Sequence, residues 1–391
     1  MRHFRRFVLS ALLALKAEIT GGWHRVVKRR QILIGGGALA LVGTSLAYLG
    51  FRQLGSMEAC SASAAATRAT LSQRPEMRDF IRYATLAPNG HNTQPWRFRV
   101  GQNRIEIVPD FSRRTPIVDP DDHHIFVSLG CAAENLALAA AARGHPGEVG
   151  FEPANDGTVV LIFGDGRHAS PALFDAIPRR QSTRADYDGK SIATSDLEML
   201  ARAAIVPGVD LVLITERPQI DRVRDLVVAG NSIQMADAAF VRELRSWLRF
   251  SPREAMQTGD GLFSAASGSP TLPSWLGPRV FDWVFTVDGE NEKYARQLRS
   301  SAGIAVFVSQ KEDREHWVLA GRACQRFALQ ATALGLKHAF INQPVEVARL
   351  RPELASLIGM AGRRPDLVMR FGYGPTLPYS ARRPVDTIMI A

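Results

Sequence analysis

The residues whose types and spacing most suggest chemistry lie in Leu86–Phe98, which reads L-A-P-N-G-H-N-T-Q-P-W-R-F. This stretch joins a Pro-Asn-Gly turn to an Asn-Thr-Gln cluster and carries no strong charge. A turn of this kind exposes backbone amides and amide side chains. Such groups suit the edge of a planar, polar, uncharged ring better than they suit a phosphate or a metal. We therefore predict that this loop holds one side of such a ring.

A second set of candidate binding residues is Arg180, Ser182 and Arg184. Because they alternate, an extended backbone would place all three side chains on one face. Two guanidinium groups around a hydroxyl suit a terminal phosphate. The spacing alone is also compatible with a solvated basic turn. A further arginine pair, Arg382 and Arg383, follows a Gly-Tyr-Gly-Pro turn near the C-terminus, where an exposed tail is the alternative.

Other motifs that carry chemistry are missing from the sequence or have a simpler explanation. It contains no Walker-type phosphate loop, no G-x-G-x-x-G between a strand and a helix, and no G-x-S-x-G nucleophile elbow. Asp119–His124 reads D-P-D-D-H-H, but adjacent histidines point in different directions, and acidic residues favour the helix start expected there. Cys131 and Cys324 lie in Ala/Leu-rich runs and are predicted to be structural thiols. We therefore predict no metal site and no catalytic side chain.

An internal repeat indicates how the chain is organised. The pattern G-x-A-x-x-x-(L/F)-A-L-x-A-x-x-x-G occurs at Gly130–Gly144 and again at Gly321–Gly335, 191 positions later. Both copies are small and apolar nearly all round, which is typical of a buried helix that ends at a glycine cap. Chance similarity between two Ala-rich helices is the alternative. The repeat predicts two related halves, with a site at their interface.

The elements around these residues alternate between strands and helices, so we predict an α+β fold with a mixed sheet. The pattern predicts a helix before the polar loop and strands directly after it. A long helix is predicted over residues 218–250. Residues 251–287 are rich in Gly and Pro but also contain Phe263, Trp275, Phe281 and Trp283. Because disordered segments usually lack aromatic residues, we predict a lid over a pocket there, with a packed surface insertion as the alternative.

The positive charge is concentrated at the N-terminus. The chain has a net charge of +10, and residues 1–70 hold ten Lys or Arg against two Glu, which leaves +2 for the rest. A nucleic-acid binder would carry its positive charge on the folded domain, so we expect no nucleic-acid partner. Lys28–Gln31 precedes an apolar run, 32–50, and a small-residue segment, 61–66, and this arrangement resembles a twin-arginine export signal.

That resemblance implies transport by the twin-arginine translocation machinery, which carries folded proteins and would allow a cofactor to be inserted before export. The body would be periplasmic if the signal is cleaved. The apolar run is also long enough to span a bilayer, and an uncleaved anchor would hold the body on the outer face of the inner membrane. A buried helix of the fold is the third alternative.

Together these motifs resemble the FMN-dependent nitroreductase family. The segment 87–96 (A-P-N-G-H-N-T-Q-P-W) is similar to the family's A-P-S-x-x-N-x-Q-P-W loop, although family serines are replaced. The segment 180–184 is similar to its Arg-x-Ser-x-Arg motif, and 382–384 to its basic C-terminal segment. The resemblance covers roughly residues 75–391. It implies a nitroreductase-like α/β sandwich.

The order of the motifs is reversed relative to the family, in which Arg-x-Ser-x-Arg precedes the loop. A fused pair explains the reversal, with the loop kept in a first half (71–176), the arginines in a second half (177–391), and 1–70 as signal or anchor plus linker. The arrangement is similar to the Acg-type branch. It implies a monomer that mimics the family homodimer and binds one FMN between its halves.

The resemblance also implies which residues contact FMN. Arginines from the second half and Ser182 would surround the phosphate and ribityl chain, and the first-half loop would contact the isoalloxazine ring. The glycine that ends the second repeat would approach the ring edge. The implied cofactor-binding residues are Pro88, Asn89, Gly90, Asn92, Arg180, Ser182, Arg184, Gly335, Arg382 and Arg383.

Two functions follow from this resemblance. In the first, the chain is an oxidoreductase whose FMN passes electrons from a donor such as NAD(P)H to a small planar acceptor, such as a nitro compound or a quinone. In the second, it stores or sequesters FMN beneath a closed lid and turns over little. A structural protein with a vestigial fold is a third alternative.

Overall fold

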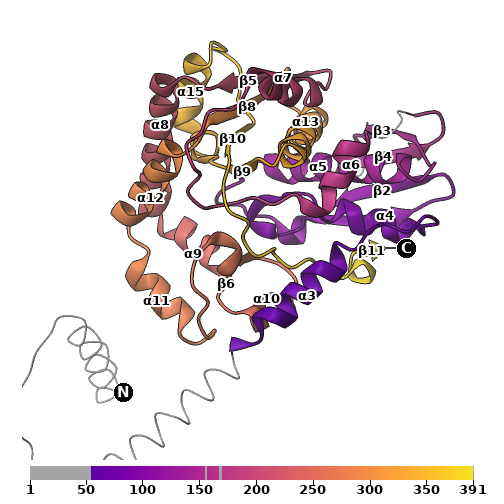
Figure 1. Cartoon of the computed structure of the whole chain (residues 1–391), viewed down its shortest axis with the longest axis horizontal. Helices are drawn as coiled ribbons and strands as arrows, with labels where there is room; N and C mark the ends of the chain where they lie inside the picture. The colour runs from indigo at the N-terminus through magenta and orange to yellow at the C-terminus, as the bar shows by residue number, and fades with distance from the viewer. Residues whose placement is uncertain (1–53, 155, 167–169, 391) are drawn as a thin grey trace, which may run out of the picture. The chain divides into compact units, whose positions relative to one another are not determined.

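The computed structural model describes residues 54–154, 156–166 and 170–390, and these form one compact unit of mixed helices and strands (Figure 1). The expected export segment, including Lys28–Gln31 and the apolar run 32–50, lies outside the described residues. The small-residue segment 61–66 is described, and it forms part of a helix, α3 (Met57–Thr67). The prediction of an α+β fold is confirmed.

The first sheet follows the polar loop. Its strand order is β11-β1-β2-β4-β3, and β1 to β4 pair antiparallel. The last strand of the chain, β11, pairs parallel with β1, with Phe98 opposite Met389. The C-terminal strand therefore returns to the sheet that follows the polar loop. The strands are β1 (Trp96–Val100), β2 (Arg104–Pro109), β3 (Gly147–Glu152), β4 (Thr158–Phe163) and β11 (Met389–Ile390).

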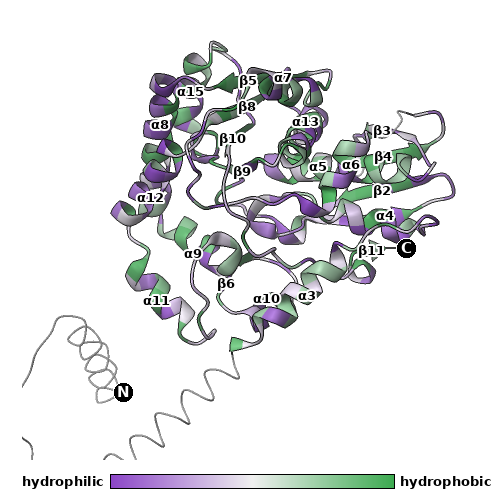
Figure 2. Cartoon of the chain, in the orientation of Figure 1, coloured by the Kyte–Doolittle hydropathy of each residue, from purple (hydrophilic) through white to green (hydrophobic). Residues whose placement is uncertain are grey.

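The second sheet has the order β5-β8-β10-β9, with antiparallel pairing throughout. Its central strands are buried over their whole length and are mostly hydrophobic, as sheet strands covered on both faces should be (Figure 2), with Arg370 as a buried exception. Read in chain order, its strands occupy the same positions as β1, β2, β3 and β4 of the first sheet. The strands are β5 (Val209–Ile214), β8 (Gly303–Ser309), β9 (Lys337–Phe340) and β10 (Leu367–Gly372).

The two copies of the repeat form α5 (His123–Ala141) and α13 (Arg314–Ala333), which pack on each other and each on one sheet. A Cβ at Gly130 would lie 2.0 Å from the carbonyl oxygen of Val318, and a Cβ at Gly321 would lie 2.0 Å from that of Val127. The two contacts are related by the same 191-residue offset as the repeat. Glycine at both positions therefore allows the helix backbones to touch.

Charges and thiols at this helix pair are also buried. Glu134 of α5 accepts hydrogen bonds from Arg322 (3.0 Å) and Arg326 (2.7 Å) of α13. The cysteines Cys131 and Cys324 are buried and free, as predicted for structural thiols. By length and composition, α5 is the one described helix that could cross a membrane, but it is largely buried in this core.

Of the remaining helices, α8, α12 and α15 pack on the second sheet, whereas α4 packs on α5, and α6 and α7 pack on α13. The helix before the polar loop is α4, as predicted. The single helix predicted over 218–250 is wrong, because Asp237 leaves the helical conformation and its side chain caps a new helix by accepting from the Ala239 amide at 2.7 Å. The helices are α4 (Met77–Ala84), α6 (Pro171–Ala176), α7 (Thr194–Ala203), α8 (Arg217–Ala236), α9 (Ala238–Ser246), α12 (Val287–Arg299), α14 (Gln343–Glu346) and α15 (Arg351–Leu357).

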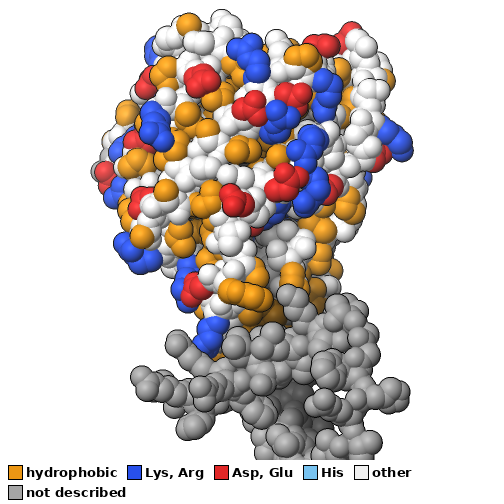
Figure 3. All heavy atoms as spheres, turned by 90° about the vertical axis from the view of Figure 1, so that its left-hand side faces the viewer, with side chains coloured by type: hydrophobic (Ala, Val, Ile, Leu, Met, Phe, Trp, Pro, Cys, Tyr) orange, Lys and Arg blue, Asp and Glu red, His pale blue; other side chains and the backbone are white. Residues whose placement is uncertain are grey.

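Residues 251–287, called the lid below, are more regular than their Gly and Pro content predicts. They contain α10 (Pro252–Thr258), the short strand β7 (Leu262–Phe263) and α11 (Gly277–Val284), and β7 pairs with β6 (Leu248–Arg249). α3 packs against α10 at the lower edge of Figure 1. Figure 3 shows basic and acidic side chains interspersed on one face of the body rather than gathered into a basic patch.

Candidate functional site

The polar loop after α4 is held in an unusual backbone conformation. His91, Asn92 and Gln94 all have positive φ, at 47°, 55° and 53°. Left-handed backbone is uncommon for residues other than glycine and is costly unless the surroundings fix it. The Asn89 side chain accepts a hydrogen bond from the Gln94 amide at 2.8 Å, which closes the loop on itself. The strain is therefore concentrated where the sequence predicts a binding loop.

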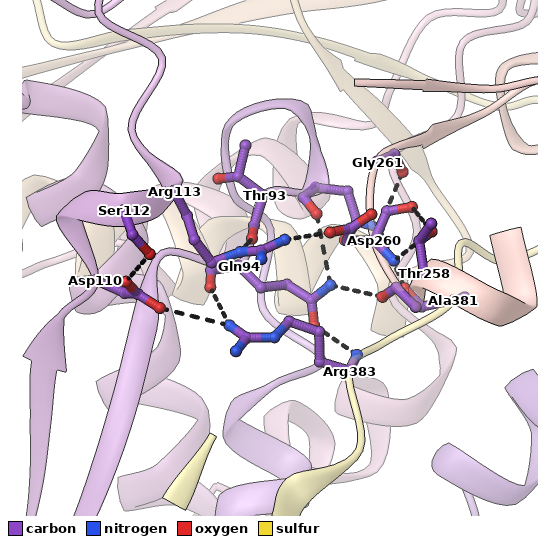
Figure 4. A network of polar contacts seen from close by, with 12 residues as sticks. Thr93, Gln94, Asp110, Ser112, Arg113, Thr258, Asp260, Gly261, Ala381 and Arg383 are labelled. Carbon is purple, nitrogen blue, oxygen red and sulfur yellow. Dashed lines mark hydrogen bonds and ion pairs between the residues drawn. The ribbon is translucent and has the colours of Figure 1, made fainter. Parts of the chain in front are cut away.

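Contacts from the lid and the C-terminal segment fix this conformation. The Asn92 side chain donates to the carbonyl oxygens of Gly261 (3.0 Å) and Ala381 (3.2 Å). The Gln94 side chain donates to the carbonyl oxygen of Gly259 at 2.8 Å and accepts from the Arg383 amide at 2.9 Å (Figure 4). Two segments that are far from the loop in sequence therefore meet at it.

Beside the loop lies a small cavity of about 70 Å³ with four arginines in its lining. Arg180 donates to the carbonyl oxygen of Leu86 at 3.0 Å, and Arg382 donates to that of Thr85 at 2.6 Å. Both guanidinium groups thus contact the carboxyl end of α4, where the helix dipole favours positive charge. The four arginines are Arg68, Arg180, Arg184 and Arg382.

Within the described part of the chain, none of these four arginines forms an ion pair with a carboxylate. The Nε atoms of Arg68 and Arg180 are buried without a hydrogen-bond partner. Burial lowers the pKa of each of these two side chains to about 10, and it lowers the pKa of Arg184 and Arg382 as well. Uncompensated buried cations are costly. An anion in this cavity would supply the missing charge and hydrogen-bond acceptors.

A larger cavity of about 390 Å³ also has Pro88, Asn89 and Arg184 in its lining. A Cβ at Gly90 would meet nothing within 4 Å, so the backbone of the loop borders open space. His91 lines the same cavity; burial first, and then the nearby charge of Arg184, lower its pKa to about 4, so it is neutral at pH 7. The loop therefore presents an uncharged surface beside the arginine cavity.

The residues that line the larger cavity include an apolar group and a polar group, called its apolar wall and its polar wall below. Its apolar wall comes from α9, the lid and the residues that flank them. The aromatic side chains of this wall are Phe240, Phe250, Phe281 and Phe285. Its polar wall includes Asp119, His124, Gln234 and Glu346. An amphipathic or aromatic molecule would match such a cavity.

The polar wall contains the D-P-D-D-H-H segment. The Asp119 carboxylate accepts from the backbone amide of His124 at 3.0 Å and also bonds the ring of His124. Asp119, His123 and His124 lie close enough together to hold a metal ion by distance. However, the Asp119 carboxylate accepts from the backbone amides of His124 and Ile125 in the first turn of α5, and His123 bonds Asp366 at 2.9 Å. The position of this segment at the start of the buried helix agrees with the sequence prediction.

Eight of the ten predicted cofactor-binding residues line one or both cavities: Pro88, Asn89, Gly90, Asn92, Arg180, Ser182, Arg184 and Arg382. Gly335 does not line either cavity, because it lies exposed beyond the end of α13. Arg383 points away from them, and its guanidinium group contacts the carbonyl oxygen of Gln94 at 3.3 Å and the carboxylate of Asp110 at 3.8 Å (Figure 4). The cavities give these two residues no support, and their contact with a cofactor stays a prediction.

Sequence reasoning missed Arg68 and His91. Arg68 follows the segment 61–66 that resembles a cleavage zone, and nothing local in the sequence connects it with the distant arginines. His91 lies inside the predicted loop, and its buried Nδ1 has no hydrogen-bond partner among the described residues. Its place within a predicted polar binding loop was the sequence feature that could have indicated that His91 lines the cavity.

Comparison with known proteins gives distant relatives, and no family model matches the chain. Over 329 residues the chain is 27% identical to a Mycobacterium tuberculosis protein provisionally named NAD(P)H nitroreductase Rv3131, covering 80% of this chain and 90% of that protein. It is 23% identical to a second M. tuberculosis protein, provisionally named NAD(P)H nitroreductase acg, covering 80% and 94%.

Solved structures give weaker matches. A nitroreductase with bound FMN from Desulfitobacterium hafniense is 13% identical, with a TM-score of 0.36, over 57% of this chain and 99% of that one. The FMN-dependent nitroreductase NfnB from Mycobacterium smegmatis, in complex with NADPH, is 12% identical, with a TM-score of 0.34, over 52% and 87%. Because these scores are low, the fold assignment rests on the sheets and helices described above.

Proposed function

We propose that the chain binds one FMN and acts as a nitroreductase-like oxidoreductase. The observation that carries this proposal is the pairing of two surfaces. One is a cavity with four arginines and no carboxylate partner, and the other is an uncharged loop with open space beside it. FMN has the matching pair of features, a dianionic phosphate and a planar polar ring.

In this proposal the phosphate would be held by Arg180, Arg184 and Arg382, with Ser182 beside it. The loop 88–92 would hold the ring, and its strained backbone, fixed by the lid and the C-terminal segment, would give the ring a rigid surface. When bound, FMN would supply the redox chemistry. The side chains of the chain would position it and shield it from water.

The larger cavity would bind a small planar electron acceptor. Its aromatic wall suits a flat apolar molecule, and its polar wall offers hydrogen bonds. NAD(P)H is the proposed donor, and the names of the two M. tuberculosis relatives are consistent with it. No side chain is proposed as a catalytic acid or base.

A second function, FMN storage or sequestration, is favoured by one observation. Asn92 and Gln94 bond the lid carbonyls of Gly261 and Gly259, so the lid is fastened to the same loop that would hold the ring. A lid that stays fastened would keep donors and acceptors away from the flavin. The two functions differ in whether the flavin can be reduced by NAD(P)H and reoxidised by an acceptor.

We further propose that the body is a tandem pair of nitroreductase-like halves that works as a monomer. The matching strand orders of the two sheets and the reciprocal glycine contacts of α5 and α13 support a fused pair. The loop comes from the first half, and Arg180, Arg184 and Arg382 come from the second. On this account FMN lies between the halves, and one complete site serves the whole chain.

The proposed location is outside the cytoplasmic membrane, after export by the twin-arginine translocation machinery. The body would be periplasmic or tethered to the inner membrane. This proposal rests on the sequence of residues 28–66. Comparing the mass of the protein purified from the periplasm with that of the full chain, with and without a functional twin-arginine system, would test it.

The proposed function is tested by the visible spectrum of the purified full chain, followed by anaerobic addition of NADH or NADPH. A yellow protein that is bleached by a nucleotide and reoxidised by a nitroaromatic or quinone supports the oxidoreductase. A yellow protein that neither nucleotide reduces supports storage. A colourless protein that takes up no added FMN would contradict both functions.

A further inference from the structure

The arginine cavity includes one residue from outside both predicted halves. Arg68 follows α3 and lies before the first half as the sequence divides it. It lines the cavity together with Arg180, Arg184 and Arg382, which lie more than a hundred positions later. Its charge contributes to lowering the pKa of Arg382, after burial itself, so the two side chains are close enough to repel each other.

Arg68 has few interactions within the protein. Its guanidinium group lies over the ring of Tyr379 at 4.0 Å, and one Nη atom bonds the carbonyl oxygen of Ala64 at 3.4 Å, the limit of a hydrogen bond. Its Nε is buried without a partner, and no carboxylate in the described residues pairs with it. The ring of Tyr379 restricts the orientation of this side chain but does not neutralise it.

The helix that carries Arg68 is packed firmly on the body. Cys60 and Ala64 of α3 are buried against Ala255, Phe263 and Ala266, which belong to the lid. After the helix, Arg82 donates to the carbonyl oxygens of Thr67 (2.9 Å) and Ala69 (2.8 Å). These contacts hold the backbone on both sides of Arg68. The position of its side chain at the cavity is therefore fixed by packing.

From these observations we infer that Arg68 is a fourth cationic ligand of the anion held in the arginine cavity, and that α3 is a required part of the binding site. This inference rests on the proposed function, in which the anion is the phosphate of FMN. It has a consequence for processing. Cleavage of an export signal within 61–66 would remove part of α3 and release Arg68, so any cleavage in the FMN-binding protein lies before the cap of α3 at Ser56.

The test uses full-length variants and measures the Kd for FMN and for riboflavin by fluorescence titration. Arg68→Ala is expected to weaken FMN binding at least tenfold and to leave riboflavin binding unchanged, because riboflavin has no phosphate. The Kd of Arg68→Lys for FMN should lie between those of the parent and Arg68→Ala, since lysine keeps the charge but lacks the paired N–H donors of a guanidinium group. Arg74→Ala, an exposed arginine on the same segment, is the matched control and should bind FMN like the parent.

Two further measurements separate the inference from the proposed function. Inorganic phosphate should raise the melting temperature of the flavin-free parent more than that of the flavin-free Arg68→Ala protein. If Arg68→Ala binds FMN as tightly as the parent while Arg184→Ala loses it, the inference is wrong and the proposed function stands. If neither the parent nor any variant binds FMN, both fail. A flavin-loaded mature protein whose N-terminus lies within 61–66 would also overturn the inference.

Discussion

Arg184 offers the cleanest test of the arginine cavity, because its guanidinium group has no hydrogen bond or ion pair with the described residues. Burial makes its charge unfavourable when no anion is bound. Arg184→Ala should therefore leave the flavin-free protein as stable as the parent, or make it slightly more stable. The same change removes charge-assisted hydrogen bonds to a bound phosphate.

A charge-assisted hydrogen bond contributes about 1.5–3 kcal/mol, so the Kd for FMN should rise about 10- to 150-fold. At FMN equal to 100 times the parent Kd, the ligand stabilises the parent by about 2.7 kcal/mol. With a thirtyfold weaker Kd the same FMN concentration would stabilise the variant by only about 0.9 kcal/mol. Thermal melts with and without FMN would measure both effects on the same sample.

Arg383→Ala is the matched control, since Arg383 adjoins a cavity arginine in sequence but points into the network around Gln94 (Figure 4). It should lower the melting temperature while changing the Kd for FMN less than about threefold, because it removes the guanidinium contacts with the Gln94 carbonyl oxygen and the Asp110 carboxylate. The reasoning would be refuted if Arg184→Ala destabilised the flavin-free protein and left the Kd unchanged, or if Arg383→Ala weakened FMN binding as strongly as Arg184→Ala.

Three other predictions concern the helix pair and the lid. Burial alone would raise the pKa of Glu134, but its two arginine partners lower this pKa overall. Glu134 therefore stabilises the fold at pH values above its unfolded pKa near 4.5, and this stability is lost as the pH falls through the lower folded pKa. Urea unfolding at pH 3 to 7 should therefore show that the parent loses stability at acid pH and that Glu134→Gln does not show this loss. Parallel plots of unfolding free energy against pH for the two proteins would contradict this. Gly321→Ala should cost about 1–3 kcal/mol, measured by urea unfolding, because its Cβ would overlap the Val127 carbonyl; an unchanged midpoint would refute the close contact. Asn92→Ala should unfasten the lid, so that limited proteolysis cuts 251–287 faster while the rest of the chain keeps the parent's pattern; equal cleavage rates would count against the latch.

The sequence was sufficient to predict the polar loop and most of the arginine cavity because their chemistry is local. Residues 88–92 form one turn, and Arg180, Ser182 and Arg184 alternate on one short extended segment. The repeat also predicted two buried helices with left-handed glycines near their ends, and Gly144 and Gly335 have φ of 79° and 77°.

The sequence could not predict the features that tertiary packing decides. Arg382 and Arg383 are adjacent, so their side chains point in different directions, and only one reaches the cavity. Gly335 caps its helix but lies exposed at its end. Arg68 reaches the cavity only because α3 packs on the lid, a contact that no periodicity in the sequence indicates. The single helix predicted over 218–250 failed because the cap at Asp237 divides an otherwise continuous apolar pattern.

The central claim is that one cavity binds a phosphate while the neighbouring loop binds the flavin ring. Titration of the flavin-free protein with FMN and with riboflavin, at the same salt concentration, tests it most directly. The two ligands share the ring and differ in the phosphate, so FMN should bind at least 100-fold more tightly than riboflavin. This ratio corresponds to a difference in binding free energy of about 2.7 kcal/mol or more. Equal affinities would contradict the assignment of the arginine cavity, and failure of both ligands to bind would contradict the flavin site itself.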